Sequence, residues 1–187
     1  MTRREEIIKE AALLFKAKGY GAASMRDLAE RIGLEAASLY NHIKSKEEIL
    51  KEICFVTAQK YVVQLELIEQ NEKSAVEKIK ALLRLHISMI TDCKEEVFVC
   101  NNEYKHLTEP YLSDFQVVRR SYEQRFLAII EQGIANKELK EIDPNIALFT
   151  LLSAVRWLEI WYKPERKISS KNLQNDVVTI LLGGLIK

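Results

Sequence analysis

The chain has 187 residues, of which 48% are hydrophobic and 29% are charged. This composition is typical of a globular protein with its own core and excludes a chain that is disordered throughout. The 28 Lys and Arg residues against 27 Asp and Glu give a net charge of +1, which excludes a polycationic nucleic-acid coat but not a local basic surface. With only 6 Gly and 3 Pro, an all-β sandwich or a doubly wound sheet is disfavoured, because both need many tight turns.

The cysteines and the apolar runs indicate the compartment. Cys54, Cys93 and Cys100 form no CxxC pair, and an odd count does not describe a disulfide framework, so a reducing cytoplasm is the simpler location. The sequence contains no run of 18 apolar residues and no apolar stretch of the signal-peptide kind at its start. We therefore expect a cytoplasmic protein without a membrane partner, and we predict no metal and no other cofactor.

Helical periodicity begins at the N-terminus, and capping boxes mark its boundaries. In a capping box, a Ser or Thr side chain and an acidic side chain three positions later each accept a bond from the other residue's backbone N–H. The chain has three such pairs near its start: Thr2 with Glu5, Ser24 with Asp27, and Ser45 with Glu48. They predict helices over residues 2–19, 24–33 and 45–71, with a very short helix over residues 35–43 between the last two.

Five further helices are predicted beyond residue 71 from apolar residues at helical spacing. They cover roughly residues 74–91, 96–104, 115–136, 146–162 and 170–185. Asp143 and Pro144 give the fourth of these an N-cap followed by proline in the first turn. The sequence thus predicts nine helices and no convincing strand, which is an all-α fold.

Residues 25–44, with the sequence MRDLAERIGLEAASLYNHIK, carry the strongest functional signal. Two short helices that cross closely need a small residue at the crossing, which Ala29 supplies, and a turn with positive φ, which Gly33 supplies. Leu39 and Ile43 would anchor the second helix in the core and leave its other face outward. This spacing is typical of a helix-turn-helix, although two short helices joined by a glycine turn can also form a plain αα-corner.

The outward face of the second short helix is suited to a DNA groove. Small side chains allow close approach, while hydroxyl, amide and imidazole groups can hydrogen-bond to bases or phosphates. Basic residues, Arg4 among them, lie at nearby helix starts and flanks where phosphates would pass, and the free N–H groups at Ser24 and Ser45 are ready phosphate anchors. The predicted DNA-binding residues are Arg3, Ser24, Arg26, Ala37, Ser38, Tyr40, Asn41, His42, Lys44 and Lys46.

Residues 19–50, GYGAASMRDLAERIGLEAASLYNHIKSKEEIL, closely resemble the N-terminal DNA-binding domain of TetR-type transcriptional repressors. The resemblance implies a nine-helix TetR-like fold with a three-helix DNA-binding domain at residues 1–48, whose helix-turn-helix motif spans residues 24–43. It also implies a helical ligand-binding and dimerisation domain at residues 49–187. By the same resemblance, Ser24 and Lys46 would bind backbone phosphate and Arg26 would reach phosphate or the groove edge. The recognition helix would be lined by Ser38, Tyr40 and His42.

One short recognition helix gives limited discrimination, so a homodimer that reads two half-sites of double-stranded DNA is expected. The last two predicted helices carry apolar stripes, and the resemblance implies that they form a four-helix bundle across the dimer. The predicted interface residues are Leu151, Val155, Leu158, Val178, Leu181, Leu182 and Leu185. The alternative is that these stripes pack only within one subunit.

Aromatic and polar residues interleave in the middle helices, as in the apolar, sparsely polar lining of a small-molecule site. Any one of them is also explained by a place in the core. Trp157 and Trp161 belong to a W-x-x-x-W-Y-x-P pattern that resembles the acyl-CoA-sensing branch of the family, in which an aromatic-plus-Arg surface would hold adenine and phosphates. The same tryptophan pair could instead anchor the helix end. The predicted ligand-binding residues are His86, Met89, Phe98, Tyr104, Tyr122, Phe126, Arg156, Trp157 and Trp161.

Together these features predict a ligand-responsive, DNA-binding transcriptional regulator, and the resemblance makes a repressor the default. A small hydrophobic or acyl-CoA-like effector would release the dimer from a palindromic operator. The alternative is a DNA-binding or interaction protein of the same fold without small-molecule control, for example in cell division or chromosome organisation. An enzyme is not predicted, because Cys100 and His106 are the only thiol and imidazole close in sequence and neither lies in a recognisable signature.

Overall fold

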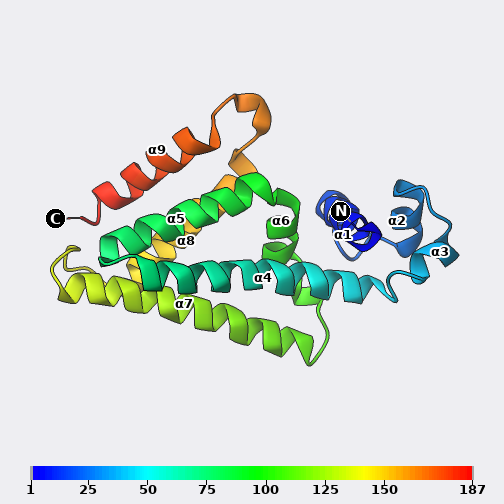
Figure 1. Cartoon of the computed structure of the whole chain (residues 1–187), viewed down its shortest axis with the longest axis horizontal. Helices are drawn as coiled ribbons and strands as arrows, with labels where there is room; N and C mark the ends of the chain where they lie inside the picture. Colours follow the sequence, from blue (N-terminus) through cyan, green and yellow to red (C-terminus); the bar gives the residue numbers. More distant parts are fainter. Residues whose placement is uncertain (1, 187) are drawn as a thin grey trace. The chain divides into compact units, whose positions relative to one another are not determined.

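The computed structural model describes residues 2–186, which form nine α-helices and two short 3₁₀-helices, with no β-strand in that range (Figure 1). The α-helices are α1 (Arg3–Lys18), α2 (Met25–Arg31), α3 (Ala36–Tyr40), α4 (Lys46–Asn71), α5 (Ala75–Asp92), α6 (Lys94–Asn102), α7 (Tyr111–Ala135), α8 (Pro144–Trp161) and α9 (Ser170–Gly183). The 3₁₀-helices are η1 (Tyr104–His106) and η2 (Pro164–Arg166). The predicted all-α fold and the predicted number of helices are confirmed. None of the described helices is long and apolar enough to cross a membrane.

Local side-chain bonds explain where the early helices begin. Thr2 Oγ1 accepts a hydrogen bond from the Glu5 N–H (3.2 Å), and the Glu5 carboxylate accepts one from the Thr2 N–H (2.8 Å), so the predicted capping box closes α1. The second predicted box is formed in the same way at the start of α2. At α4 the Glu48 N–H donates to Ser45 Oγ (3.0 Å), while the Glu48 carboxylate accepts from the Lys44 N–H (2.8 Å). The Glu48 carboxylate thus binds the Lys44 N–H where the predicted box has the Ser45 N–H, and it fixes the loop that precedes α4.

The chain divides into two compact units. The first comprises Met1–Lys60 and Glu95–Val118, and the second comprises Tyr61–Lys94 and Arg119–Lys187. The first unit thus contains α1–α3, the first part of α4, most of α6, η1 and the start of α7. This division does not coincide with the predicted domain boundary after residue 48, because α6 and η1 pack with the N-terminal helices although they lie far along the sequence.

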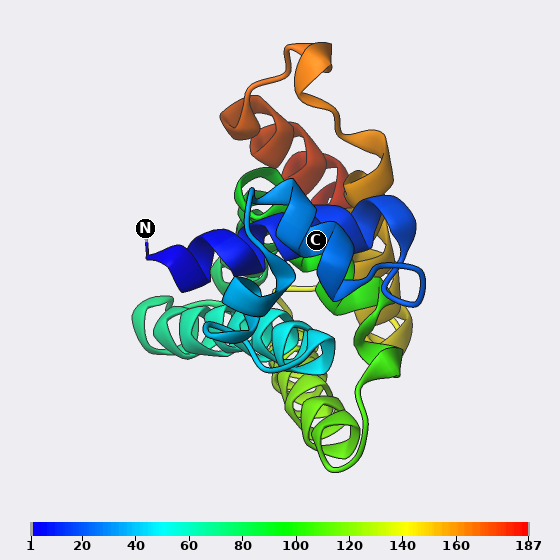
Figure 2. The same cartoon turned by 90° about the vertical axis from the view of Figure 1, so that its right-hand side faces the viewer.

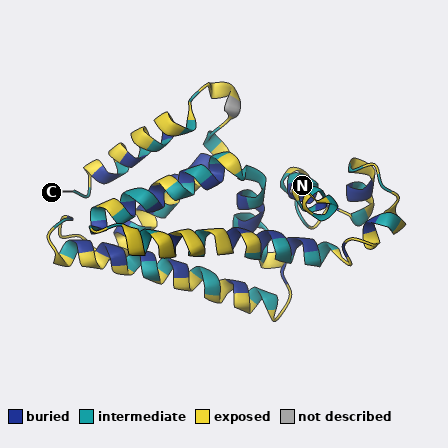
Figure 3. Cartoon of the chain, in the orientation of Figure 1, coloured by how far each residue is buried: buried dark blue, intermediate teal, exposed yellow. Residues whose placement is uncertain are grey.

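The first unit has a continuous apolar core beneath its short helices. Figure 2 views this unit with α1–α3 toward the reader, and Figure 3 shows the buried positions along each helix. Fully burying one such side chain contributes about 1.5–3 kcal/mol. Two glycines end helices with positive φ, Gly19 at +80° and Gly33 at +65°, and the positive φ predicted for Gly33 is confirmed. The largest fully buried side chains are Ile7, Phe15, Leu28, Leu39, Ile43, Ile49, Leu50, Ile53 and Phe115.

In the second unit, α5 packs against both α8 and α9 (Figure 1). Lys94 Nζ donates a hydrogen bond to the Tyr162 carbonyl (2.7 Å), which fastens the end of α8 to the first residue of α6. The Asp143 carboxylate caps α8 and Pro144 occupies its first turn, as predicted. The apolar positions of α8 that face α5 are consequently held in a fixed register.

Candidate nucleic-acid interface and effector site

The turn between α2 and α3 sets the direction of the recognition helix. Gly33 takes positive φ, and the Leu34 N–H donates to the Ala29 carbonyl (2.9 Å) across the turn. Within α3 only Leu39 is buried, with no exposed area, whereas Tyr40 keeps 51% of its surface exposed. Leu39 therefore anchors α3 in the core, and the helix keeps an exposed face formed by Ala36, Ala37 and Tyr40, as a helix that enters a DNA groove requires.

Seven of the ten predicted DNA-binding residues are exposed, and two of the other three have protein partners. Ser38 is half-buried on α3. Arg3 pairs with Glu6 and donates to the Ile32 carbonyl (3.1 Å), so its guanidinium supports the end of α2. The exposed residues come from the start of α2, from α3 and from the loop that follows α3: Ser24, Arg26, Ala37, Tyr40, Asn41, His42 and Lys44.

Lys46 holds the turn between α1 and α2. Its ammonium group donates to the carbonyls of Tyr20 (2.8 Å) and Ala23 (2.7 Å), and it lies 4.4 Å from the centre of the Tyr20 ring. An ammonium group has three N–H donors, and two of them are used here. Two donors of Lys46 therefore stabilise this turn, and a phosphate contact would have only the third donor.

Ser24 was predicted to offer a free N–H to phosphate, and this prediction is wrong. The Asp27 carboxylate accepts hydrogen bonds from both the N–H (2.9 Å) and the hydroxyl (2.6 Å) of Ser24. Lys18 Nζ also donates to it (2.9 Å). The hydroxyl of Ser24 and the ammonium of Lys18 hold the pKa of Asp27 far below its usual range. Because this carboxylate stays ionised, it competes with any phosphate at the start of α2.

Sequence reasoning missed the contacts of Tyr20. Its ring stacks on the His106 ring with 5.3 Å between centroids, and its N–H donates to the Glu103 carboxylate (3.3 Å). Burial, with the charge of Glu47, raises the pKa of Tyr20. These partners join the turn between α1 and α2 to the segment around η1. No local sequence pattern indicates these contacts, since more than eighty residues separate Tyr20 from Glu103.

The thiol and imidazole that are close in sequence have different surroundings. Cys100 is buried and its thiol donates to the Cys54 carbonyl (3.7 Å), whereas His106 stacks on Tyr20. Within the part of the chain that the structure describes, no three His, Cys, Asp or Glu side chains gather as they would around a metal ion.

The predicted ligand-binding residues are divided between the two units. His86 of α5 and Tyr122 of α7 lie together in the second unit, with 2.9 Å between His86 Nε2 and the Tyr122 hydroxyl. The Tyr61 ring covers His86 at 4.8 Å. Met89 and Phe126 are buried in the same unit. Phe98 and Tyr104 belong to the first unit, where Phe98 lies near Lys16 and Tyr104 near Phe115.

Burial sets the charge of the polar pair in the second unit. It lowers the pKa of His86 to about 4 and raises the pKa of Tyr122. Both side chains are therefore neutral near pH 7, and their contact is a hydrogen bond between uncharged groups. Such a pair can recognise an uncharged oxygen of a ligand but offers no charge to a carboxylate or phosphate.

The depressed pKa of His86 makes stability depend on pH. Between pH 6.5 and pH 4 the unfolded chain binds a proton at His86 that the folded chain does not bind, so stability is full above pH 6.5 and falls as the pH approaches 4. The loss attributable to this side chain is at most about 3 kcal/mol. We expect thermal unfolding from pH 7.5 to 4.5 to show a shallower loss of Tm for His86→Gln than for the parent chain. Parallel curves would contradict a buried neutral histidine.

The tryptophan segment at the end of α8 has an arginine partner that the sequence did not identify. The Arg166 guanidinium lies 4.6 Å from the centre of the Trp161 ring, and its Nε–H donates to the Trp161 carbonyl (3.1 Å). Arg156 and Trp157 are exposed on α8. An aromatic ring with a guanidinium over it is an arrangement that can also stack a planar base.

Helices α8 and α9 have a second apolar face besides the predicted one. Five of the seven predicted interface residues are buried within the subunit, and Leu181 and Leu185 are half-buried. The buried five are Leu151, Val155, Leu158, Val178 and Leu182. On the other side of the two helices lie large apolar side chains that the subunit leaves exposed, and we call this set the apolar outer face: Ile146, Phe149, Trp157, Ile160 and Ile180. An exposed apolar surface of this kind is typical of a protein interface.

Two family models match the chain. The model described as "Bacterial regulatory proteins, tetR family" matches residues 7–53, and the model described as "Tetracyclin repressor-like, C-terminal domain" matches residues 72–185. The first match contains the helix-turn-helix, and the second contains most of the second unit. Together they account for both parts of the chain.

Curated and solved relatives cover nearly the whole chain. The HTH-type transcriptional repressor KstR2 of Mycolicibacterium smegmatis is 28% identical over 98% of this chain and 91% of its own. The structure of the ketosteroid transcriptional regulator KstR2 of Mycobacterium tuberculosis matches with a TM-score of 0.95 at 22% identity, over 100% and 96% of the two chains. The structure of AibR in complex with isovaleryl coenzyme A and operator DNA matches with a TM-score of 0.84 at 24% identity, over 96% and 97%. At these identities the two structures establish the fold.

Proposed function

We propose that this protein represses transcription by binding a palindromic operator as a homodimer. The premise is that the chain belongs to the TetR family of bacterial regulatory proteins and is a DNA-binding transcriptional regulator. The observation that carries this proposal is the outward face of α3, in which Leu39 is the one buried residue. Tyr40, Asn41 and His42 offer hydroxyl, amide and imidazole groups to base edges, and the exposed Lys44 offers charge to phosphate.

The apolar outer face of α8 and α9 supports the homodimer. Its α8 members, Ile146, Phe149, Trp157 and Ile160, follow helical spacing and so share one side of the helix. A second copy of the same face would cover them, and two-fold symmetry would place two recognition helices about 34–36 Å apart, one turn of DNA. The half-buried Leu181 and Leu185 of the predicted set lie at or just beyond the end of α9 and could join this contact.

We further propose that a coenzyme A thioester with an apolar acyl group releases the repressor. The adenine would stack on Trp161, and the phosphates would meet Arg156 and Arg166. Trp157 is left to the apolar outer face, and the thioester oxygen would meet the neutral His86–Tyr122 pair. The coenzyme A ligand named for AibR supports this assignment. An effector that prefers the non-binding state lowers DNA affinity by its coupling free energy, which is typically about 1–3 kcal/mol.

Selection from a pool of random duplexes at fixed salt tests the repressor proposal. The purified protein should enrich a palindrome, and a long-chain acyl-CoA should release the enriched duplex about fivefold to a hundredfold more readily than free coenzyme A does. An enriched palindrome with no response to any acyl-CoA would reject this effector class. No enrichment by a folded dimer, even after unfolding and refolding to remove bound ligand, would favour an interaction protein without operator binding.

A further inference from the structure

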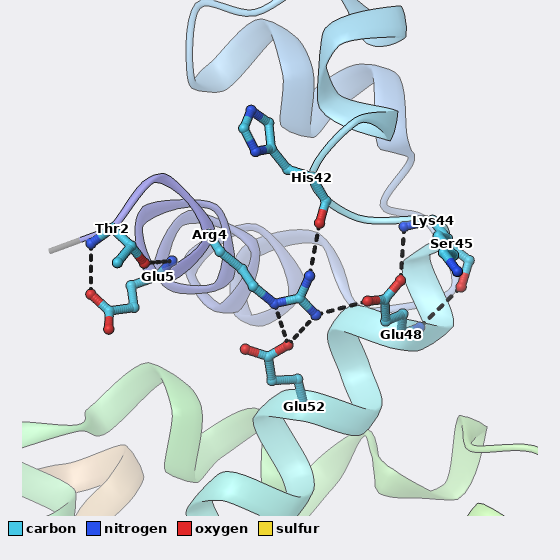
Figure 4. A network of polar contacts seen from close by, with 8 residues as sticks. All are labelled: Thr2, Arg4, Glu5, His42, Lys44, Ser45, Glu48 and Glu52. Atoms are coloured by element: carbon cyan, nitrogen blue, oxygen red, sulfur yellow. Dashed lines mark hydrogen bonds and ion pairs between the residues drawn. The ribbon is translucent and has the colours of Figure 1, made fainter.

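Arg4 lies at the centre of a polar network that joins three segments of the first unit (Figure 4). From the first turn of α1, its Nε–H and one Nη2–H donate to the Glu52 carboxylate (3.0 and 2.6 Å). A second Nη2–H donates to the Glu48 carboxylate (2.7 Å), and an Nη1–H donates to the His42 carbonyl (2.7 Å). Four of the five N–H donors of the guanidinium are therefore used inside the protein.

The same network holds the loop after the recognition helix at two backbone points. The His42 carbonyl is bound by Arg4, and the Lys44 N–H donates to the second oxygen of the Glu48 carboxylate (2.8 Å). Between these two points, the side chain of Ile43 is buried. The loop is thus fixed on both sides of its anchor residue, and the directions of the exposed His42 and Lys44 side chains are fixed with it.

The charges of the network do not favour a direct role in binding DNA. Two carboxylates surround one guanidinium, so the network carries a net negative charge beside residues that face outward. The bonds from Arg4 keep the pKa of Glu48 below its usual range, so this carboxylate stays ionised. Negative charge near a phosphate backbone lowers DNA affinity. We therefore expect the two carboxylates to have another role that offsets this loss.

We propose that Arg4, with Glu48 and Glu52, is a positioning residue for operator binding: it orients the loop at His42–Lys44 and does not contact DNA phosphate. This differs from the sequence-based expectation that Arg4 lies where phosphates pass. The inference rests on the operator binding proposed above, and it adds that specific recognition depends on a network outside the recognition helix.

Salt dependence separates positioning from phosphate contact. Losing a phosphate contact reduces the slope of log affinity against log salt by about 1, and it weakens binding to all sequences about equally. For Arg4→Met we expect about tenfold weaker binding to the selected operator, an unchanged salt slope, and unchanged affinity for a random duplex. Lys44→Ala is the matched control, because removal of this exposed cation should reduce the slope by about 1.

For two further variants, the positioning role and the change in charge alone predict different changes in operator affinity. Glu52→Gln removes a negative charge, which by itself would strengthen DNA binding, yet loss of the Arg4 contact should weaken operator binding several-fold. Arg4→Lys keeps the charge but cannot reach both carboxylates and the His42 carbonyl from one planar group, so it should not restore affinity. Thermal unfolding of each variant verifies that it is folded at the assay temperature.

The outcomes distinguish this inference from the proposed function. An operator bound equally well by the parent chain, Arg4→Met and Glu52→Gln would overturn the positioning role and leave the repressor proposal intact. A salt slope reduced by about 1 in Arg4→Met, with affinity restored by Arg4→Lys, would show a phosphate contact instead. If the parent chain enriches no operator, both proposals fail together.

Discussion

Phe149→Asp is expected to convert the proposed homodimer to monomers and to weaken operator binding at least about a hundredfold. Phe149 is 74% exposed in the subunit and belongs to the apolar outer face. A carboxylate there would be buried against a second apolar surface without a partner, and such burial costs several kcal/mol. A linked pair of half-site readers gains about 10²–10⁴ in affinity over a single one, so dissociation removes that gain.

Light scattering with size-exclusion chromatography measures the mass, and a titration with the selected operator measures the affinity. Gln124→Asp is the matched control, because it adds the same charge at an exposed position of α7. It should remain a dimer with parental affinity. A Phe149→Asp protein that stays dimeric would place the interface elsewhere. Leu181 and Leu185 would then be the next candidates for interface residues.

Gly133→Val is expected to lower the free energy of unfolding by about 3 kcal/mol and Tm by about 6–12 °C. Gly133 is buried in α7, where a Cβ would lie 2.8 Å from Leu139 Cδ1 and 2.9 Å from Ala75 Cβ. The Leu139 side chain can shift, but the Ala75 Cβ is attached directly to the backbone of α5. The larger side chain must therefore separate two elements of the second unit.

Gly21→Ala is the control for this substitution. At Gly21 an added Cβ would meet nothing within 4 Å, and its φ is not in the left-handed region. Its stability should change by less than about 1 kcal/mol, with a small gain expected from the reduced freedom of the unfolded chain. Chemical denaturation of both variants gives the comparison, and parental stability for Gly133→Val would show that α5 and α7 can separate without cost.

The starts of α1 and α2 were predictable because their causes are local. The bonds of Thr2 with Glu5 join residues three apart, and the positive φ of Gly33 follows from the needs of one turn. The contacts of Arg4 and Lys46 were not predictable in this way. Their partners lie 48 and 26 residues away, so the sequence shows two basic residues near a DNA-binding motif and not the carboxylates or carbonyls that engage them.

The two faces of α8 show a different limit of sequence reasoning. Leu151 and Val155 are buried within the subunit, whereas Phe149 and Ile160 are exposed. A helix that is apolar on both sides has no single stripe, and periodicity cannot say which side meets its own subunit. The folded structure decides this point, because α5 packs against α8.

The single anchor of α3 has a consequence for the divergence of regulators. Leu39 is its only buried residue, so substitutions at Ala37, Tyr40 and Asn41 change the chemical surface of the helix with little effect on the core. A lineage can therefore acquire a new target sequence through few mutations while its stability is preserved. For the same reason, the chain offers protein engineers a scaffold whose α3 positions can be randomised together.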